Sequence, residues 1–281
     1  HILITPTLLS AASYVFTRQI YTCITNGYGK LPESMPEGNE YYCFGEAEEV
    51  GPWKVLPGKD CGDPVRSSRY YKINCPFDTS VYVDATKLHL LREPFFTLSH
   101  EILNTYDDKM FCMQHPHSHS YLNEMMEYYN NGWWSKDEII QYTSELNDIE
   151  FDFKKFFSPL CTILWRKNRK EFNDMWWKWY QKGGVRDQIS FSTSLQVLKM
   201  NFRYENSVKF LNHFTSAGRP AKTREWWQTR SGDYSYYKPK DSNEMLRILC
   251  DMTGLSNFRY KPCCVGNPLS NAVLENRKDI T

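Results

Sequence analysis

Several signatures of well-known protein classes are missing from this 281-residue chain. It has no Gly-x-Gly-x-x-Gly fingerprint and no Walker loop, so the two commonest glycine-rich phosphate sites are excluded. The nucleophile elbow Gly-x-Ser-x-Gly is also missing, which argues against a serine hydrolase. Internal repeats and low-complexity segments are absent too. Any functional site must therefore be found from individual side chains.

An excess of either charge is lacking as well. The chain has 34 Lys and Arg against 33 Asp and Glu, a net charge of +1. Such a balance creates no global field that would attract nucleic acid or an anionic membrane. The apolar opening from Ile2 to Ala12 has no basic flank, is interrupted by Pro6 and is too short to span a bilayer. We therefore predict a cytoplasmic protein without a membrane span and without a nucleic-acid partner.

The nine cysteines lack the spacing of a metal site. No Cys-x-x-Cys pair occurs and the number is odd, which argues against structural zinc and against a secreted disulfide framework. We predict buried free thiols in a reducing compartment.

Aromatic residues are abundant, at 16% of the chain. Large rings pack in ordinary cores and also against the faces of sugars, and composition does not separate the two uses. The length suffices for a single domain with a sizeable core. We divide it into a helical extension over 1–18, a core over 19–195 and a C-terminal region over 196–281.

The hydrophobic pattern alternates between strands and helices, which indicates an α/β fold. Runs of β-branched and aromatic residues predict strands over 20–25, 40–44, 53–56, 80–83, 110–113 and 162–165. Helical spacing predicts helices over 7–18, 121–130, 136–146, 171–181 and 189–200. Ser135 and Glu138 form a capping box, and Pro and Gly residues predict a loop over 57–66.

Two aspartates stand at positions where a strand ends or a helix begins. Asp84 follows the strand over 80–83, and ligands of open α/β sheets lie outside such carboxyl ends. Asp187 follows Gly183 and Gly184 in the triplet Arg186-Asp187-Gln188, where glycine permits close approach of a ligand. For each aspartate there is also a purely structural interpretation. Asp84 would only cap the next turn, and Asp187 would only add negative charge to a helix N-terminus.

Three further segments carry polar groups. The turn Asn26-Gly27-Tyr28-Gly29 after the first strand suits a nucleotide base or ribose. His115, His117 and His119 stand at alternating positions. In an extended segment they would lie on one side and could hold a metal ion; in a loop, a single histidine would contact the substrate. Residues 218–224, just after His213, suit a polyphosphate or a solvated linker.

Four stretches in this order resemble one family, the A-type-fold glycosyltransferases of plants, bacteria and large viruses, long described as a domain of unknown function. They are Tyr21–Leu31 with Tyr42–Phe44, Arg69–Lys72 leading to Tyr82–Ala85, His115–Pro116, and Trp176–Trp177 leading to Arg186–Phe191. The resemblance implies a single-domain A-type fold, with a mixed central sheet flanked by helices. It also implies a UDP-sugar donor and an oligosaccharide or glycoprotein glycan as acceptor. The size is similar to that of viral members that transfer xylose to capsid glycans in the host cytoplasm.

The resemblance also implies roles for individual residues. Asp187 would be the catalytic base of an inverting transfer. Donor contacts would come from Thr22, Thr25, Arg69, Lys72, Asp84 and Ala85. Contacts with the acceptor or the sugar would come from His115, Trp177, Arg186 and Gln188.

The metal site departs from the family pattern. A-type transferases usually carry Asp-x-Asp after this strand, whereas Thr86 stands in the second position here. A divalent cation, Mn²⁺ or Mg²⁺, would be held by Asp84 with His213 or water. The alternative is a metal-independent site in which Arg69 and Lys72 neutralise the diphosphate.

Two other functions stay open. The missing second aspartate and the many aromatic rings also suit a glycan-binding protein that keeps the transferase fold without catalysis. A hydrolase that uses His115 and Asp84 is the third alternative.

Overall fold

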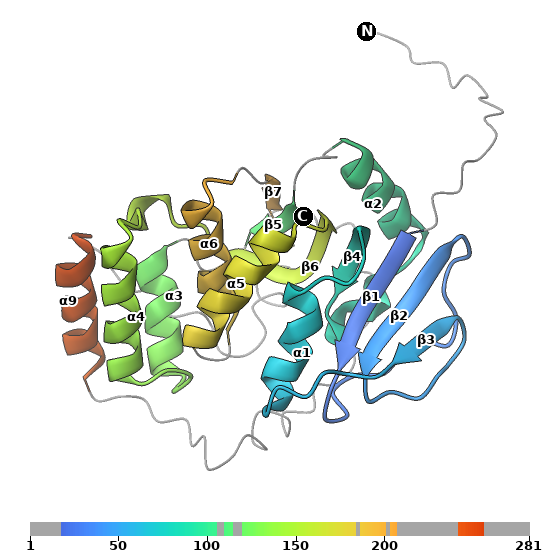
Figure 1. The fold of residues 1–281 in the computed structure, drawn as a ribbon, viewed down its shortest axis with the longest axis horizontal. Coiled ribbons are helices and arrows are strands. Elements are labelled where there is room, and N and C mark those ends of the chain that lie inside the picture. Colours follow the sequence, from blue (N-terminus) through green and yellow to red (C-terminus); the bar gives the residue numbers. More distant parts are fainter. Residues whose placement is uncertain are drawn as a thin grey trace, which may run out of the picture.

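A single seven-stranded sheet organises the chain, with helices on both of its faces (Figure 1). The computed structural model describes residues 18–105, 110–114, 120–183, 186–200, 203–206 and 241–255. The strands are β1 (Arg18–Ile24), β2 (Asn39–Gly45), β3 (Trp53–Leu56), β4 (Thr79–Val83), β5 (Phe111–Gln114), β6 (Pro159–Lys167) and β7 (Arg203–Asn206). The α/β class predicted from the sequence is confirmed.

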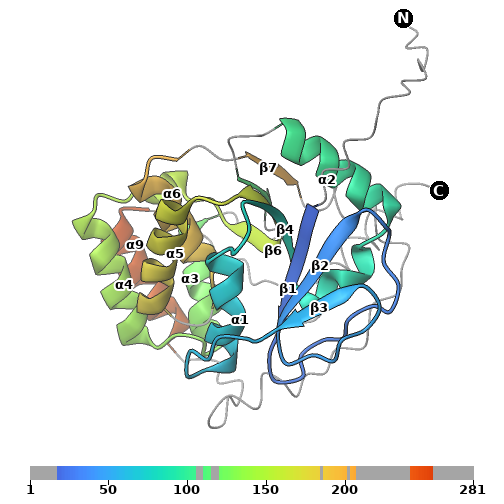
Figure 2. The ribbon, with the colours of Figure 1, turned by 45° about the vertical axis from the view of Figure 1, so that its right-hand side comes forward.

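The strand order in the sheet is β3-β2-β1-β4-β6-β5-β7. β1 pairs in parallel with both β2 and β4, while β6 runs antiparallel to β4 and β5. The sheet is therefore mixed. The chain builds from β1 towards β2 and β3, and then returns to place β4 on the other side of β1, as Figure 2 shows. The carboxyl ends of β1 and β4 thus border a reversal of strand order, where ligands bind in open α/β sheets.

The helices lie on the faces of the sheet and at one end of the molecule (Figure 1). They are α1 (Pro64–Ile73), η1 (Ala85–Leu90), α2 (Glu93–Thr105), α3 (Tyr121–Asn130), α4 (Lys136–Asp148), η2 (Phe153–Lys155), α5 (Lys170–Lys182), α6 (Gln188–Val197) and α9 (Ser242–Thr253).

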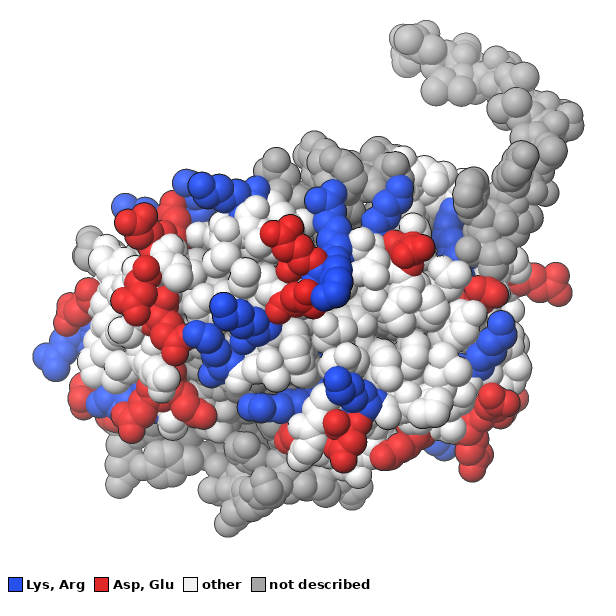
Figure 3. All heavy atoms as spheres, in the orientation of Figure 1, with Lys and Arg blue, Asp and Glu red and all other residues white. Residues whose placement is uncertain are grey.

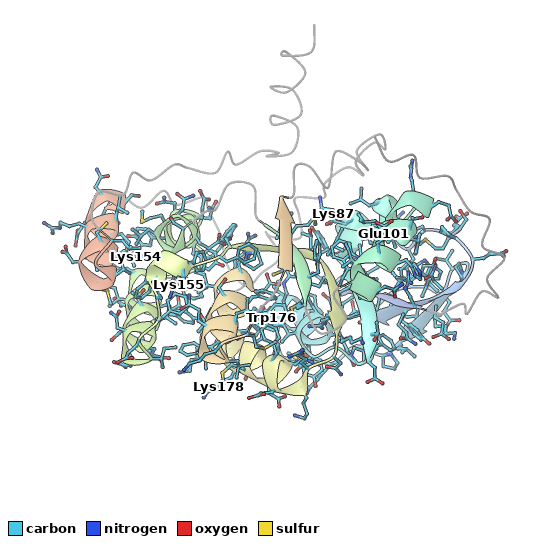
Figure 4. The ribbon with its side chains drawn as sticks, turned by 90° about the horizontal axis from the view of Figure 1, so that it is seen from above. Lys87, Glu101, Lys154, Lys155, Trp176 and Lys178 are labelled. Carbon is cyan, nitrogen blue, oxygen red and sulfur yellow. The ribbon has the colours of Figure 1, made fainter. Side chains whose placement is uncertain are left out.

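Alternation along the strands divides the core between the two faces. Ile20 and Val81 belong to the apolar cluster under η1 and α2, whereas Tyr21 and Tyr82 belong to the cluster under α1, α5 and α6. Trp176 points inward from α5 and is fully buried, while Lys178 of the same helix points outward (Figure 4). α1, α5 and α6 therefore form one layer on this face of the sheet.

A third apolar cluster joins α3, α4 and α9, which lie side by side at the end of the molecule opposite β3 (Figure 1). It is rich in aromatic rings, including the edge-on pairs Tyr128 with Trp134 and Tyr142 with Trp179. Trp179 of α5 and Ile189 of α6 tie these helices to the rest of the chain.

The sequence predicted most of the strands but not all of the helices. The six predicted strands, the helices over 121–130, 136–146, 171–181 and 189–200, and the Ser135–Glu138 capping box are confirmed within a few residues. The loop predicted over 57–66 is wrong at its end, because α1 begins at Pro64 with Asp63 as its N-cap. α2, α9 and β7 were not predicted. The helix predicted over 7–18 lies outside the described residues, except that Arg18 begins β1.

The remaining global predictions concern cysteine and charge. The seven cysteines in the described part of the chain are free, and five of them are buried. Lysine and arginine alternate with acidic residues over the face seen in Figure 3, so no large patch of one sign forms there. No helix among the described residues has both the length and the apolar character to cross a membrane.

Candidate functional site

The turn after β1 lies against the segment that follows β4. Asn26, Gly27 and Gly29 have positive φ angles of 53°, 65° and 112°, a backbone shape that glycine adopts without strain. A Cβ atom on Gly29 would come within 2.7 Å of the Cβ of Ala85. Glycine at this position therefore lets the two strand ends close on each other.

Asp84 occupies the N-cap position of η1, but its side chain makes no capping hydrogen bond. Instead its Oδ1 accepts a hydrogen bond of 2.7 Å from the Tyr82 hydroxyl and lies 3.6 Å from Nζ of Lys72. The side chain keeps 18% of its surface exposed. The side chain of Asp84 therefore does not cap the next turn, and its partly exposed carboxylate is held by Tyr82 and Lys72 instead.

Asp187 repeats this arrangement at the start of α6. It stands at the N-cap position without capping the helix. Its Oδ2 lies 2.7 Å from Nζ of Lys72 and 3.6 Å from Nε of Arg69. The carbonyl of Asp187 accepts hydrogen bonds from Trp176 Nε1 at 3.2 Å and from the Phe191 amide at 3.1 Å. The backbone of Asp187 is therefore fixed, and its carboxylate pairs with two cations in addition to standing at a helix N-terminus.

Arg69 and Lys72 reach both carboxylates from α1. Their spacing of three residues places them on one side of the helix. Lys72 has a side chain only 2% exposed and lies between Asp84 and Asp187, so it joins the end of β4 to the start of α6. We call Arg69, Lys72, Asp84 and Asp187 the charged cluster. The structure thus brings together four residues that the sequence had assigned to one site.

The proton affinities in the charged cluster reflect its pairing. Burial alone would raise the pKa of the Asp187 carboxyl, but Lys72, Arg69 and Arg186 outweigh it and hold the pKa below its usual value. Burial lowers the pKa of Arg69, and the neighbouring carboxylates of Asp187 and Asp84 more than reverse that effect. Both groups are therefore fully ionised at neutral pH.

A third cation and several rings stand next to the cluster. The guanidinium of Arg186 lies over the ring of Trp133, 4.7 Å from its centroid. Trp133 and Tyr28 both pack against Val65 of α1. Burial and the charge of Asp84 raise the pKa of Tyr28, which places its hydroxyl in the field of the cluster. Partly buried rings beside cations and carboxylates suit a sugar, whose faces are apolar and whose hydroxyls are polar.

Gln188 connects the site to α3. Its Oε1 accepts a hydrogen bond of 3.4 Å from the hydroxyl of Tyr128. Burial and the charge of Glu124 raise the pKa of Tyr128, so this phenol stays protonated. Glu124 is buried and accepts a hydrogen bond of 2.9 Å from Ser158. A buried polar network therefore runs from α6 into the α3 layer.

Three predicted site residues have other surroundings. Thr22 is completely buried within β1, two residues before the end of the strand, so its side chain does not reach the cluster. The hydroxyl of Thr25 donates to the carbonyl of Pro64 at 2.8 Å and ties β1 to α1. The ring of Trp177 packs edge-on against Tyr70, 5.3 Å between centroids, and joins α5 to α1. These side chains support the site instead of lining it in this structure.

The remaining two predicted residues, His115 and His213, lie outside the described residues. Within the residues that the structure describes, no group of three His, Cys, Asp or Glu side chains is arranged to hold a metal ion. Asp84 does offer a free oxygen, because its Oδ2 has no hydrogen bond or ion pair in the described part of the chain. Mg²⁺ in phosphate sites is often bound by one or two carboxylates together with the phosphates of the substrate. The donor set therefore fits a divalent ion that arrives with a diphosphate.

Sequence reasoning left four side chains out of the predicted site, although some signals were present. Tyr82 precedes Asp84 by two residues, and strand periodicity places such residues on one face. Tyr28 lies in the glycine turn that the sequence had singled out. Tyr128 and Trp133 reach the site only through the packing of α3, which no local pattern indicates.

Comparison with protein-family models, with curated proteins and with solved structures finds no match for this chain. A function must therefore be argued from the geometry of the charged cluster.

Proposed function

We propose that the protein is an inverting glycosyltransferase of the A-type fold that moves a sugar from a UDP-sugar donor to a hydroxyl group of a glycan. In its narrower form the donated sugar is xylose, and the enzyme acts in the cytoplasm. The mixed sheet with helices on both faces is compatible with the fold that the sequence resemblance implies.

One observation carries the proposal. Two carboxylates and two cations meet at the carboxyl ends of β1 and β4, where the strand order reverses, and Arg186 adds a third cation beside them. Charged groups are expensive to bury, and such arrangements gather at functional sites. A diphosphate needs this combination of fixed cations and a carboxylate that can share a metal ion.

Each group has a role in a single displacement. The acceptor oxygen forms a bond to the anomeric carbon while the bond from that carbon to the diphosphate breaks. Asp187 takes the proton of the acceptor hydroxyl, and Arg69 and Lys72 neutralise the departing diphosphate. Arg186 and Gln188 orient the sugar or the acceptor. Asp84 would hold a divalent ion, which when bound neutralises charge on the diphosphate.

A thermal-shift panel tests the proposal. The protein is heated with UDP-xylose, UDP-glucose and GDP-mannose, each with and without MnCl₂. A bound ligand raises the apparent melting temperature by mass action. We expect a shift with the uridine nucleotides that grows with manganese. The absence of any shift with every nucleotide sugar, under both conditions, refutes the proposal.

A non-catalytic glycan-binding protein is the second candidate. With Thr86 in the second position, the segment after β4 supplies one carboxylate, Asp84, instead of the two of an Asp-x-Asp pattern, which favours loss of catalysis on a retained fold. Titration with UDP separates the two candidates, because a glycan-binding module would bind oligosaccharide and ignore the nucleotide.

A further inference from the structure

The cations that a diphosphate would use are already paired in the charged cluster. Arg69 and Lys72 carry two positive charges, and Asp84 and Asp187 carry two negative ones, so the four residues are neutral together. Lys72 Nζ is closest to Asp187, at 2.7 Å. Both cations lie against the same oxygen of this carboxylate, Oδ2, and the pairing lowers the affinity of the carboxyl for a proton. It is therefore a poor base until its partners leave.

We propose that the diphosphate of the donor competes with Asp187 for Lys72 and Arg69, so that donor binding uncovers the Asp187 carboxylate for the acceptor hydroxyl. This inference rests on the proposed function and concerns the state of Asp187 before the donor is bound.

The two sides of the pairing differ in freedom of movement. Asp187 is fixed through its backbone, because its carbonyl accepts hydrogen bonds from Trp176, Ser190 and Phe191. The Lys72 ammonium sits at the end of a flexible four-carbon chain and already has a second carboxylate, Asp84, at 3.6 Å. The carboxylate therefore stays in place while the cation turns from one partner to another.

Arg69 is also held loosely. Its Nε is buried at 3.6 Å from Asp187, beyond hydrogen-bond distance, and it has no hydrogen-bond partner in the described part of the chain. An unpaired buried donor costs free energy that a phosphate oxygen would recover. Arg69 therefore gains a hydrogen bond when a diphosphate arrives, while Asp187 loses an ion pair that has no hydrogen bond from Nε.

A competition of this kind makes an unusual prediction. Removing the charge of Asp187 frees two cations, so Asp187→Asn should bind UDP more tightly than the wild type, by roughly tenfold. The same variant should transfer no sugar, because it has no base. A residue that merely supported the site would give weaker binding when changed.

The test is isothermal titration of the full chain with UDP in the presence of MnCl₂. Asp174→Asn is the matched control, since Asp174 also pairs with a lysine, Lys170, but on the exposed side of α5. We expect tighter binding for Asp187→Asn and unchanged binding for Asp174→Asn. Equal or weaker binding by a folded Asp187→Asn variant overturns the competition while leaving the proposed function intact.

A second measurement uses the unmodified protein and covers the case in which Asp187→Asn does not fold. In a crystal structure with UDP, Lys72 Nζ should contact a phosphate oxygen and should have left hydrogen-bond distance of Asp187. A complex that keeps the 2.7 Å contact refutes the inference. Failure of the wild type to bind UDP at all would refute the proposed function itself.

Discussion

Lys72 of α1 and Arg166 of β6 are both buried cations. Both contact α1 or belong to it, but their partners differ. Lys72 extends from α1 between the carboxylates of Asp84 and Asp187. Arg166, on β6, is fully buried and donates to the last carbonyls of α1, those of Lys72 at 2.5 Å and Ile73 at 3.3 Å, and to the Tyr21 hydroxyl at 2.8 Å. No carboxylate in the described part of the chain pairs with Arg166.

The difference separates a structural cation from a functional one. Arg166 satisfies carbonyl groups that a helix C-terminus leaves without partners, and a positive charge there also suits the helix dipole. Burial raises the pKa of the nearby Cys75 thiol, but Arg166 together with hydrogen bonds from Ser80 and Tyr21 outweighs burial, so the pKa is lowered. Lys72 satisfies no such need. A buried ion pair is weak evidence for stability, so the pairing of Lys72 with two strand-end and helix-start carboxylates points to chemistry instead.

Replacing Lys72 should have the largest effect. Lys72→Met removes the cation closest to Asp187, which leaves the buried Asp187 with Arg69 and Arg186 and the partly buried Asp84 without its lysine. Breaking a buried pair in this way costs about 3–5 kcal/mol in the free energy of unfolding. Urea denaturation measures that loss, and titration of the folded fraction should show little remaining affinity for UDP. Full UDP affinity in Lys72→Met would place the diphosphate elsewhere.

Replacing Arg166 should cost less stability and spare the site. Arg166→Met fills much of the same volume and leaves neutral acceptors without a donor, so we expect a loss of about 2–3 kcal/mol in the free energy of unfolding. The UDP affinity of the folded protein should stay within about threefold of the wild type. A loss of UDP affinity as large as that of Lys72→Met would erase the distinction between the two cations.

Two glycines in the turn after β1 offer a matched pair. Both have positive φ angles, but a Cβ at Gly27 meets nothing within 4 Å, whereas a Cβ at Gly29 would lie 2.7 Å from Ala85. Gly27→Ala should cost about 1 kcal/mol in the free energy of unfolding, for the backbone strain alone. Gly29→Ala should cost more and also weaken UDP binding, because it displaces the residue next to Asp84. Identical effects of the two changes on UDP binding would argue against a donor at this edge.

Acid should weaken the charged cluster through Asp187. Since the folded protein holds the pKa of this carboxyl below its usual value, the pairing stabilises the fold above the unfolded-state pKa of about 3.9. That stabilisation is lost as the pH falls towards the lower pKa of the folded state. We compare the free energy of unfolding of the wild type with that of Asp187→Asn. The difference between the two should decrease as the pH falls from about 5 to about 3. A constant difference would mean that the carboxylate is not paired in solution.

The sequence predicted the parts of the site that depend on local pattern. Asp84 was found because it follows a strand of β-branched and aromatic residues. Asp187 was found because it stands between a pair of glycines and the start of a predicted helix. Arg69 and Lys72 were selected through a family resemblance, while the helix that carries them was missed. The start signal was present in Asp63 and Pro64, a capping residue followed by proline at the first helical position.

The pairing itself could not be predicted, because it is a property of tertiary packing. Lys72 and Asp187 are 115 residues apart, and only the packing of α1 against β1 and of α6 against β6 brings them to 2.7 Å. Trp177 was assigned to the sugar or acceptor through the family resemblance. In the structure its ring packs edge-on against Tyr70 of α1, a contact that no local pattern indicates.

The most direct measurement of the central claim is the affinity for UDP of the wild type and of Asp84→Ala, each with manganese and with excess chelator. If the diphosphate lies at the ends of β1 and β4 with a metal ion on Asp84, the substitution should weaken binding about tenfold or more with manganese and by less than about threefold without it. Equal affinities of the two proteins in manganese, or sugar transfer that persists undiminished in chelator, would contradict the metal-assisted account and leave the charge of the diphosphate to Arg69 and Lys72.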